Sequence, residues 1–169
     1  LLFQDADDQL FSPTVIEDVA FGPLNLGKSK KEAVARARET LAFLGLADFE
    51  DRLTYRLSGG EKKLVSLATV LAMNPEVLLL DEPSCGLTTT ESADITSRIR
   101  DLGSKITVLM IAHDMDLVFG VAERVMLLHY GEIACEGTCD EIRSNEMLRG
   151  FPSSRERVLE SSRVCQRSC

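Results

Sequence analysis

The sequence has no tryptophan, only 5% aromatic residues and two histidines among its 169 residues. It also has no apolar run close to the roughly 18 residues that a membrane-spanning helix needs. Basic residues are outnumbered, because 19 Lys and Arg stand against 27 Asp and Glu and give a formal net charge of −8. This charge argues against nonspecific nucleic-acid binding as the main activity. No signal peptide is visible, and the chain begins Leu1-Leu2-Phe3 without Met, so we expect a fragment whose true start is missing.

The composition that remains is that of a soluble globular protein, with 44% hydrophobic and 27% charged residues. Its length suggests one domain, with room for a small subdomain. The chain has five cysteines, an odd number, and no signal sequence is visible. Together these observations indicate reduced cysteine thiols in the cytosol. Two pairs are spaced four apart, Cys135 with Cys139 and Cys165 with Cys169. This spacing could support a metal site, but no histidine stands beside either pair and structural zinc needs four converging ligands, so we do not expect a zinc site.

A hydroxyl and two glycines precede a helical pattern in the run Leu57-Ser58-Gly59-Gly60-Glu61. The spacing of Ser58 and Glu61 predicts a capping box at the start of that helix. Glycines allow another molecule to approach the backbone closely, and the free N–H groups of a helix start bind anions. The run therefore predicts a helix start that faces a phosphate. The alternative is an ordinary capped helix after a glycine turn.

Two carboxylates end an apolar run, since Val77-Leu78-Leu79-Leu80 leads directly into Asp81 and Glu82. A continuous apolar run predicts a strand buried on both faces, and ligands bind at the carboxyl ends of parallel strands. One acid could hold Mg²⁺, usually through water, while the other orients or deprotonates an attacking water molecule. The alternative is a pair of acids at a strand end before a proline turn.

Two more polar residues follow apolar strands. The run from Ile106 to Ala112 predicts a second buried strand that ends at His113, whose imidazole could reach a bound phosphate at the same sheet edge. Gln4 follows the apolar start of the chain, and its amide could ligate Mg²⁺ or position water. Taken alone, His113 could equally cap the next helix at Asp114, and Gln4 could be an ordinary loop residue.

Capping and breaking signals predict the remaining elements. A short helix after Thr14 should end at Gly22-Pro23, and a second helix should run from Ser29 to Gly45. A third should span 90–102, with Ile95 and Ile99 inward. Tyr130-Gly131 predicts a hairpin turn, and Thr138 with Glu141 predicts a last capped helix.

Strands that alternate with helices predict an α/β fold with a mostly parallel sheet covered by helices. Within a partial domain of residues 1–152, we expect a helical subdomain with the capped helix at about 5–74, and core strands and helices at 75–136. Residues 153–169 are rich in Ser and Arg, which predicts a mobile tail.

Taken in order, Gln4, Ser58-Gly59-Gly60, Asp81-Glu82 and His113 resemble the nucleotide-binding subunits of ATP-binding-cassette (ABC) transporters, which have a P-loop NTPase-like fold. The resemblance covers about residues 1–152. The motifs that carry it are the Q-loop glutamine at Gln4, the signature motif at Leu57 to Glu61, the Walker B strand at Leu78 to Pro83, the D-loop at Ser84 to Thr88 and the switch histidine at His113.

The resemblance implies a site shared by two ATPase subunits, a copy of this chain or a paralogue, that face each other head to tail. ATP would lie between the phosphate loop of one subunit and the signature helix of the other, contacted by Ser58, Gly59, Gly60 and Glu61. It further implies that Asp81 and Gln4 assist Mg²⁺, Glu82 polarises water and His113 senses the γ-phosphate. Gln4 would link the site to transmembrane partner subunits, at the cytoplasmic face of the membrane.

The sequence departs from the family in several places. No G-x-x-x-x-G-K-[ST] phosphate loop is present, so the chain alone is expected not to bind ATP normally. Glu61 stands where the family often has Gln, and Thr88 stands where the D-loop usually has Asp or Asn. The coupling that the D-loop provides between the two sites is therefore in question.

The two halves resemble different transporters. Residues 3–23 and the helix of 61–73 resemble cobalt/nickel-type and energy-coupling-factor ATPases, whereas residues 113–143 look more like branched-chain amino-acid importers. The leading prediction is an ATP-hydrolysing subunit of an importer of the cobalt/nickel or energy-coupling-factor type. The alternatives are an ATPase of a branched-chain amino-acid importer and a non-hydrolysing partner subunit.

Overall fold

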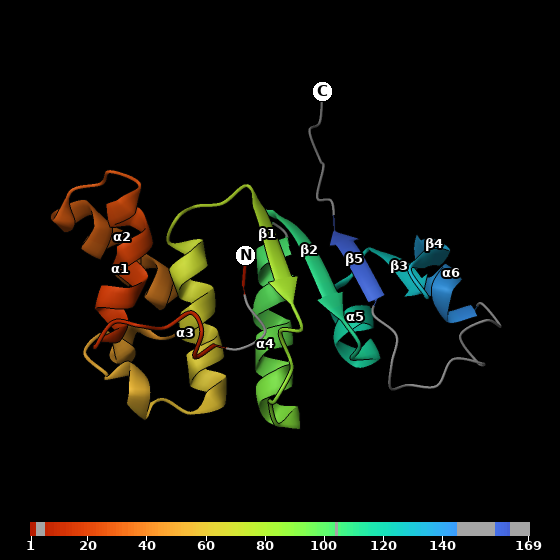
Figure 1. Cartoon of the computed structure of the whole chain (residues 1–169), viewed down its shortest axis with the longest axis horizontal. Helices are drawn as coiled ribbons and strands as arrows, with labels where there is room; N and C mark the ends of the chain where they lie inside the picture. Colours follow the sequence, from red (N-terminus) through yellow and green to blue (C-terminus); the bar gives the residue numbers. More distant parts are fainter. Residues whose placement is uncertain (3–5, 104, 145–157, 163–169) are drawn as a thin grey trace. The chain divides into compact units, whose positions relative to one another are not determined.

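The structure is a computed structural model that describes residues 1–2, 6–103 and 105–144 with their side chains, and 158–162 by their backbone. It forms two compact units, residues 1–75 with 86–88 and residues 76–85 with 89–169. The helices and strands, drawn in Figure 1, are α1 (Val15–Asn25), α2 (Lys30–Phe43), η1 (Ala47–Phe49), η2 (Thr54–Arg56), α3 (Gly59–Leu71), β1 (Val77–Asp81), α4 (Thr89–Gly103), β2 (Thr107–Ala112), α5 (Met115–Val121), β3 (Arg124–His129), β4 (Glu132–Thr138), α6 (Cys139–Ser144) and β5 (Val158–Ser162).

The first unit is built from α1, α2 and α3, which pack against one another. Its core consists of small and branched apolar side chains spaced three and four apart along each helix. Together with Leu2, those at most 1% exposed are Val15, Val19, Ala33, Ala37, Leu41, Leu44, Val65, Leu67, Ala68 and Ala72. Gly45, with φ of 68°, ends α2 as predicted.

Helix α1 continues past Gly22-Pro23 to Asn25, so the prediction that it ends there was wrong. Pro23 is buried in the last turn of the helix, where, lacking an N–H, it cannot donate to the carbonyl oxygen of Val19 four residues earlier. A Cβ at Gly22 would lie 2.6 Å from the Met73 Cγ atom. Gly22 is therefore needed for close packing rather than to end the helix.

A buried carboxylate holds the loop that precedes α1. Asp18 is 2% exposed, and its Oδ1 atom accepts hydrogen bonds from the N–H groups of Phe11 at 3.3 Å and Ser12 at 3.0 Å. Burial raises the pKa of Asp18, and these backbone donors partly oppose that rise. Helix α1 is thus fixed to the preceding loop by a side chain from its first turn.

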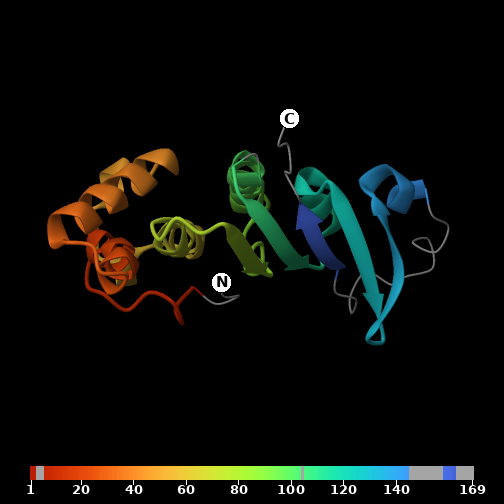
Figure 2. The same cartoon turned by 90° about the horizontal axis from the view of Figure 1, so that it is seen from above.

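The second unit contains a five-stranded sheet in the order β1-β2-β5-β3-β4. Strands β1 and β2 are parallel, and β5 runs antiparallel to both β2 and β3, so β1, β2 and β3 point in the same direction. The β3–β4 hairpin turns at Tyr130 and Gly131, with φ of 48° and 83°, as the sequence predicted. Helices α4 and α5 lie on one face of the sheet (Figure 2).

Strand β1 is buried on one face only, which corrects the prediction of burial on both. Leu78 and Leu80 are at most 1% exposed, whereas Val77 is 53% and Leu79 is 41% exposed. Successive side chains of a strand point to opposite faces, and within this unit α4 and α5 cover one face. Helix α4 seals the covered side with Ile95 and Ile99, at most 1% exposed, as predicted.

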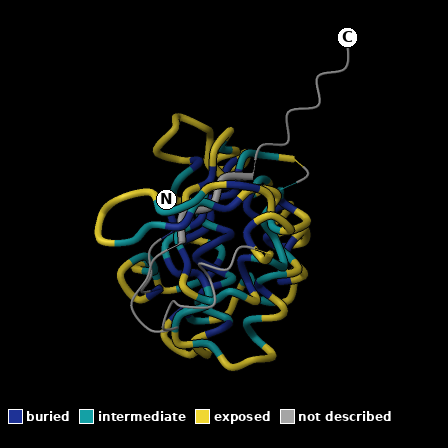
Figure 3. Tube along the Cα trace, turned by 90° about the vertical axis from the view of Figure 1, so that its right-hand side faces the viewer, coloured by how far each residue is buried: buried dark blue, intermediate teal, exposed yellow. Residues whose placement is uncertain are grey.

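Figure 3 colours the described residues by how far they are buried, and loops are among the exposed segments. Both tyrosines are exposed, Tyr55 at 68% in η2 and Tyr130 at 95% in the hairpin. Strand β5 lies within the tail that we expected to be mobile. For residues 153–157 and 163–169, outside the described part of the chain, a mobile tail stays a prediction.

Candidate functional site

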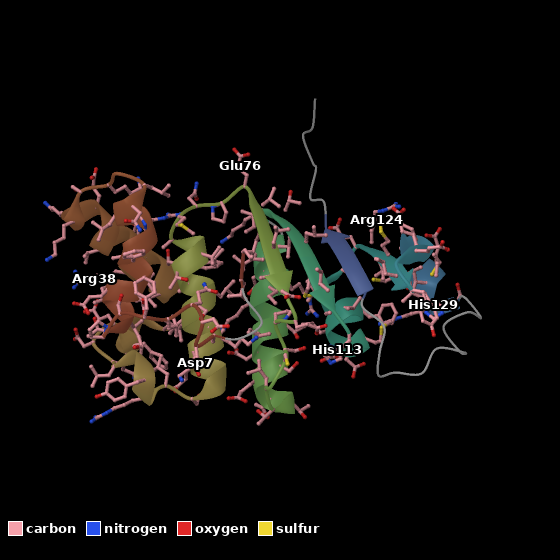
Figure 4. All side chains as sticks on the ribbon, in the orientation of Figure 1. Asp7, Arg38, Glu76, His113, Arg124 and His129 are labelled. Carbon is pink, nitrogen blue, oxygen red and sulfur yellow. The ribbon has the colours of Figure 1, made fainter. Side chains whose placement is uncertain are left out.

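Glu82 and His113 come together at the carboxyl ends of two parallel strands. Glu82 directly follows β1, and His113, which is labelled in Figure 4, directly follows β2. The His113 Nδ1 atom lies 2.5 Å from the Glu82 Oε2 atom. The carboxylate side chain is 9% exposed and the imidazole 53% exposed. The pair therefore presents a buried acid behind a histidine that solvent or a ligand can reach.

Backbone contacts fix the position of Glu82. Asp81 pairs with Ile111 in the parallel register, and the Glu82 N–H donates to the Ile111 carbonyl oxygen at 2.8 Å. The Cys85 N–H donates to the Glu82 carbonyl at 3.0 Å and closes a turn around the buried Pro83. Glu82 has φ of 46°, in the left-handed region that residues other than glycine rarely adopt. Such backbone strain is concentrated at functional sites.

Asp81 is the last residue of β1 and directly precedes Glu82 in the sequence. It is half-buried. Among the described residues, no group of three or more His, Cys, Asp or Glu could hold a metal ion. Mg²⁺ needs no such group, since it usually takes one or two carboxylates and completes its shell with water and phosphate oxygens. Asp81 fits that role, while Gln4, its predicted helper, lies outside the described residues.

The start of α3 has the predicted capping box. The Ser58 N–H donates to the Glu61 Oε2 atom at 2.8 Å, and the Glu61 N–H donates to the Ser58 Oγ atom at 3.3 Å. Gly59 is exposed and Gly60 is buried, and the N–H groups of both glycines have no hydrogen-bond acceptor among the described residues. A Cβ at Gly59 would meet no atom within 4 Å, so the space in front of the helix is open.

An arginine that the sequence analysis did not single out holds the other oxygen of Glu61. The Arg52 Nη1 atom lies 3.0 Å from the Glu61 Oε1 atom. The Arg52 guanidinium also stacks on Phe49, with its Cζ atom 3.6 Å from the ring centroid. A basic residue shortly before a capping-box Glu is the signal that could have found it. The pairing depends on the path of η1 and η2, which the residue pattern does not specify.

The segment that follows Gln4 is attached to α3. The Lys62 Nζ atom lies 2.5 Å from the Asp7 Oδ1 atom, beside the start of the helix (Figure 4). One helical turn further on, the Gln9 Nε2 atom donates to the Ser66 carbonyl oxygen and the Thr69 Oγ1 atom, both at 2.8 Å. Asp7 and Gln9 therefore attach this segment to α3 within the first unit.

The described cysteines, Cys85, Cys135 and Cys139, form no disulfide bond. Cys139 begins α6 and its Sγ atom donates to the Ala122 carbonyl oxygen at 3.1 Å. Burial raises the pKa of Cys135, which disfavours the thiolate that zinc would need.

The family model described as ABC transporter matches residues 1–85 of the chain. The chain therefore belongs to the ABC transporter family, as an ATP-binding domain. No helix in the described part of the chain has the length and apolar character that a membrane crossing requires.

Among the similar proteins are ATP-binding subunits of two transporter types. The energy-coupling factor transporter ATP-binding protein EcfA of Methanocaldococcus jannaschii is 47% identical, over 86% of this chain and 52% of the relative. The cobalt import ATP-binding protein CbiO of Rhodobacter capsulatus is 46% identical over the same shares. A relative from Methanosarcina acetivorans is 44% identical over 98% of this chain and 52% of its own length, so both halves of the chain align with one protein. The chain spans about half the length of these relatives.

Solved structures confirm the α/β fold of a P-loop NTPase-like cassette. CbiO1 of Clostridium perfringens, described as part of the ABC transporter complex cbiONQ, is 34% identical with a TM-score of 0.79. The match covers 87% of this chain and 59% of that one. MJ1267, described as an ATP-binding cassette of an ABC transporter, is 32% identical with a TM-score of 0.70, over 79% of this chain and 60% of that one.

Proposed function

We propose that this chain is part of an ATP-hydrolysing subunit of an ABC importer, of the cobalt/nickel or energy-coupling-factor type. The observation that carries the proposal is the contact between Glu82 and His113 at the ends of β1 and β2. Relatives named for cobalt import and for energy coupling align over 86% of the chain, which favours this type over a branched-chain amino-acid importer.

In this proposal Glu82 polarises the water that attacks the γ-phosphate. A buried carboxylate is an effective base when a neighbour fixes its orientation, and His113 provides that contact at 2.5 Å. The half-exposed imidazole would in turn meet the γ-phosphate and report its presence to Glu82. Phosphoryl transfer depends mainly on positioning and charge stabilisation, which such a pair can supply.

The other roles follow from the family arrangement. Asp81 and Gln4 would assist Mg²⁺, which supplies charge neutralisation when bound with ATP. The start of α3, at Ser58 to Glu61, would face ATP held by a second ATPase subunit. Gln4 and the loop attached to α3 would connect the site to transmembrane subunits, with the domain at the cytoplasmic face of the membrane.

The test is ATP turnover by a fusion in which a G-x-x-x-x-G-K-[ST] segment of a relative precedes Leu1. We expect Glu82→Gln to slow hydrolysis by about 100-fold or more while ATP stays bound, because general-base contributions are of this size. Glu132→Gln, at an exposed position on β4, is the matched control and should keep full turnover. Unchanged turnover in Glu82→Gln would exclude Glu82 as the residue that polarises water.

A second candidate function is a non-hydrolysing partner that contributes Ser58 to Gly60 to the ATP of another subunit. The N–H groups of Gly59 and Gly60, which have no hydrogen-bond acceptor among the described residues, support it. Binding of a fluorescent ATP analogue to the purified chain separates the two candidates. Tight Mg²⁺-dependent binding by these 169 residues alone would contradict our expectation that a phosphate loop is required.

A further inference from the structure

We propose that Arg52 is a positioning residue for the signature motif. By forming an ion pair with Glu61, Arg52 balances the negative charge of that carboxylate, which would otherwise repel phosphates that approach Gly59 and Gly60. The inference rests on the proposed function, in which the start of α3 faces ATP.

Glu61 creates an electrostatic conflict at this helix start. Its Oε2 atom accepts the Ser58 N–H at 2.8 Å and completes the capping box, so its charge stabilises the free helix. The same negative charge lies within a few residues of the N–H groups that would meet an anion. Since ATP carries several negative charges, an unpaired Glu61 would oppose its approach.

Arg52 resolves the conflict without breaking the capping box. It contacts Oε1, the carboxylate oxygen that the Ser58 N–H does not use, at 3.0 Å. The pair is formally neutral, and Glu61 can therefore cap the helix while its charge is balanced. A guanidinium suits this task because it stays protonated at every working pH.

The arginine is held in place from three directions. The guanidinium of Arg52 stacks on the Phe49 ring. The backbone N–H of Arg52 donates to the Phe49 carbonyl oxygen at 2.9 Å, and the backbone carbonyl oxygen of Arg52 accepts from the Val15 N–H at 3.0 Å. Among the described residues, Glu61 is the only hydrogen-bond acceptor for a guanidinium that has five N–H donors.

A titration of the whole ¹⁵N-labelled chain with inorganic triphosphate, followed by the amide signals of Gly59 and Gly60, tests the inference. We expect Arg52→Ala to weaken binding about fivefold at low salt, because it exposes one uncompensated charge near the anion. The double variant Arg52→Ala with Glu61→Gln should regain the wild-type affinity, although it also lacks the Phe49 stack. Raising the salt to about 0.3 M should shrink the difference, since screening weakens the repulsion.

Arg38→Ala is the matched control, because it removes the Arg38–Glu50 pair of 2.7 Å in the same unit and should leave the titration unchanged. Wild-type affinity in Arg52→Ala would overturn the inference. So would a double variant as weak as Arg52→Ala, which would assign Arg52 a merely structural role. Amide signals that move in no variant, Glu61→Gln included, would instead overturn the phosphate-facing function of α3 itself, and the role of Arg52 with it.

Discussion

Helices α2 and α3 begin with the same capping box in nearly the same geometry. The N–H of the capping serine donates to the glutamate at 2.9 Å in the Ser29–Glu32 box and at 2.8 Å in the Ser58–Glu61 box. The return bond to the serine Oγ atom is 3.3 Å in both. Hydrogen bonds at the cap therefore cannot distinguish a structural helix start from one that faces a ligand.

The surroundings of the two boxes differ. The first two positions of α2 are Lys30 and Lys31, whereas those of α3 are glycines that leave the backbone open. Among the described residues, the side chain of Glu32 forms hydrogen bonds only with Ser29, whereas Glu61 also forms an ion pair with Arg52. The two helix starts therefore differ in their neighbours and not in their caps, and only the neighbours of α3 suit the role that we propose for it.

The largest expected change in stability comes from removing either cap. Ser29→Ala and Ser58→Ala should each lower the free energy of unfolding by about 1 kcal/mol, because each leaves a first-turn N–H without its acceptor. Urea unfolding followed by far-ultraviolet circular dichroism measures both. Only Ser58→Ala should also weaken the triphosphate titration of the Gly59 amide. An equal effect of Ser29→Ala on that titration would contradict the assignment of the site to α3.

A smaller and opposite effect is expected from Gly59→Ala. The added Cβ meets no atom within 4 Å, and alanine restricts the unfolded chain more than glycine does. The free energy of unfolding should therefore rise by about 0.5 kcal/mol. Lys30→Ala at the equivalent position of α2 should change stability little, since both residues favour helices. If Gly59→Ala were destabilising, the open space in front of α3 would have to be described differently.

The smallest effect concerns the pH dependence of the α2 cap. Hydrogen bonds from Ser29 lower the pKa of Glu32 below its usual value of 4.5. A carboxylate with a lowered folded-state pKa contributes stability above its unfolded pKa and loses that contribution as pH falls through its folded pKa. The stability difference between the wild type and Glu32→Gln should accordingly shrink below pH 4.5. Urea unfolding at a series of pH values measures it.

The same pH dependence of the free energy of unfolding can be measured for Glu141→Gln. Hydrogen bonds from Thr138 lower the pKa of Glu141 in the box that begins α6. Its contribution should fade over the same acidic range, because the sign of the shift is the same. A contribution from either glutamate that grows as the pH falls would contradict this account of the caps.

Local sequence patterns predicted the caps and the hairpin well. The Ser58–Glu61 box and the Tyr130-Gly131 turn depend on residues at most three apart, whose geometry follows from the backbone alone. The approach of Glu82 to His113 was also foreseeable, because both residues end apolar strands that share a sheet edge. Whether these residues carry out the proposed chemistry stays a prediction.

Features that depend on packing between elements were missed. Nothing in the pattern around Asp18 indicated that a carboxylate would be buried to accept the N–H groups of a preceding loop. Similarly, Gly22-Pro23 was interpreted as a helix end because the approach of Met73 could not be known. The exposure of Leu79 depends on which face of the sheet the helices cover, and an apolar run does not contain that information.

The two exposed tyrosines determine how this protein can be observed by light. With no tryptophan and only weakly emitting phenylalanines besides, its ultraviolet emission comes mainly from Tyr55 and Tyr130, and both residues are already largely exposed in the folded state. Their emission should therefore change little on unfolding. Tyr55 stands three residues before Ser58 in the sequence, with the Arg56 Cζ atom 5.7 Å from its ring centroid. In a Tyr130→Phe background, its fluorescence becomes a single-site optical signal close in the chain to the start of α3.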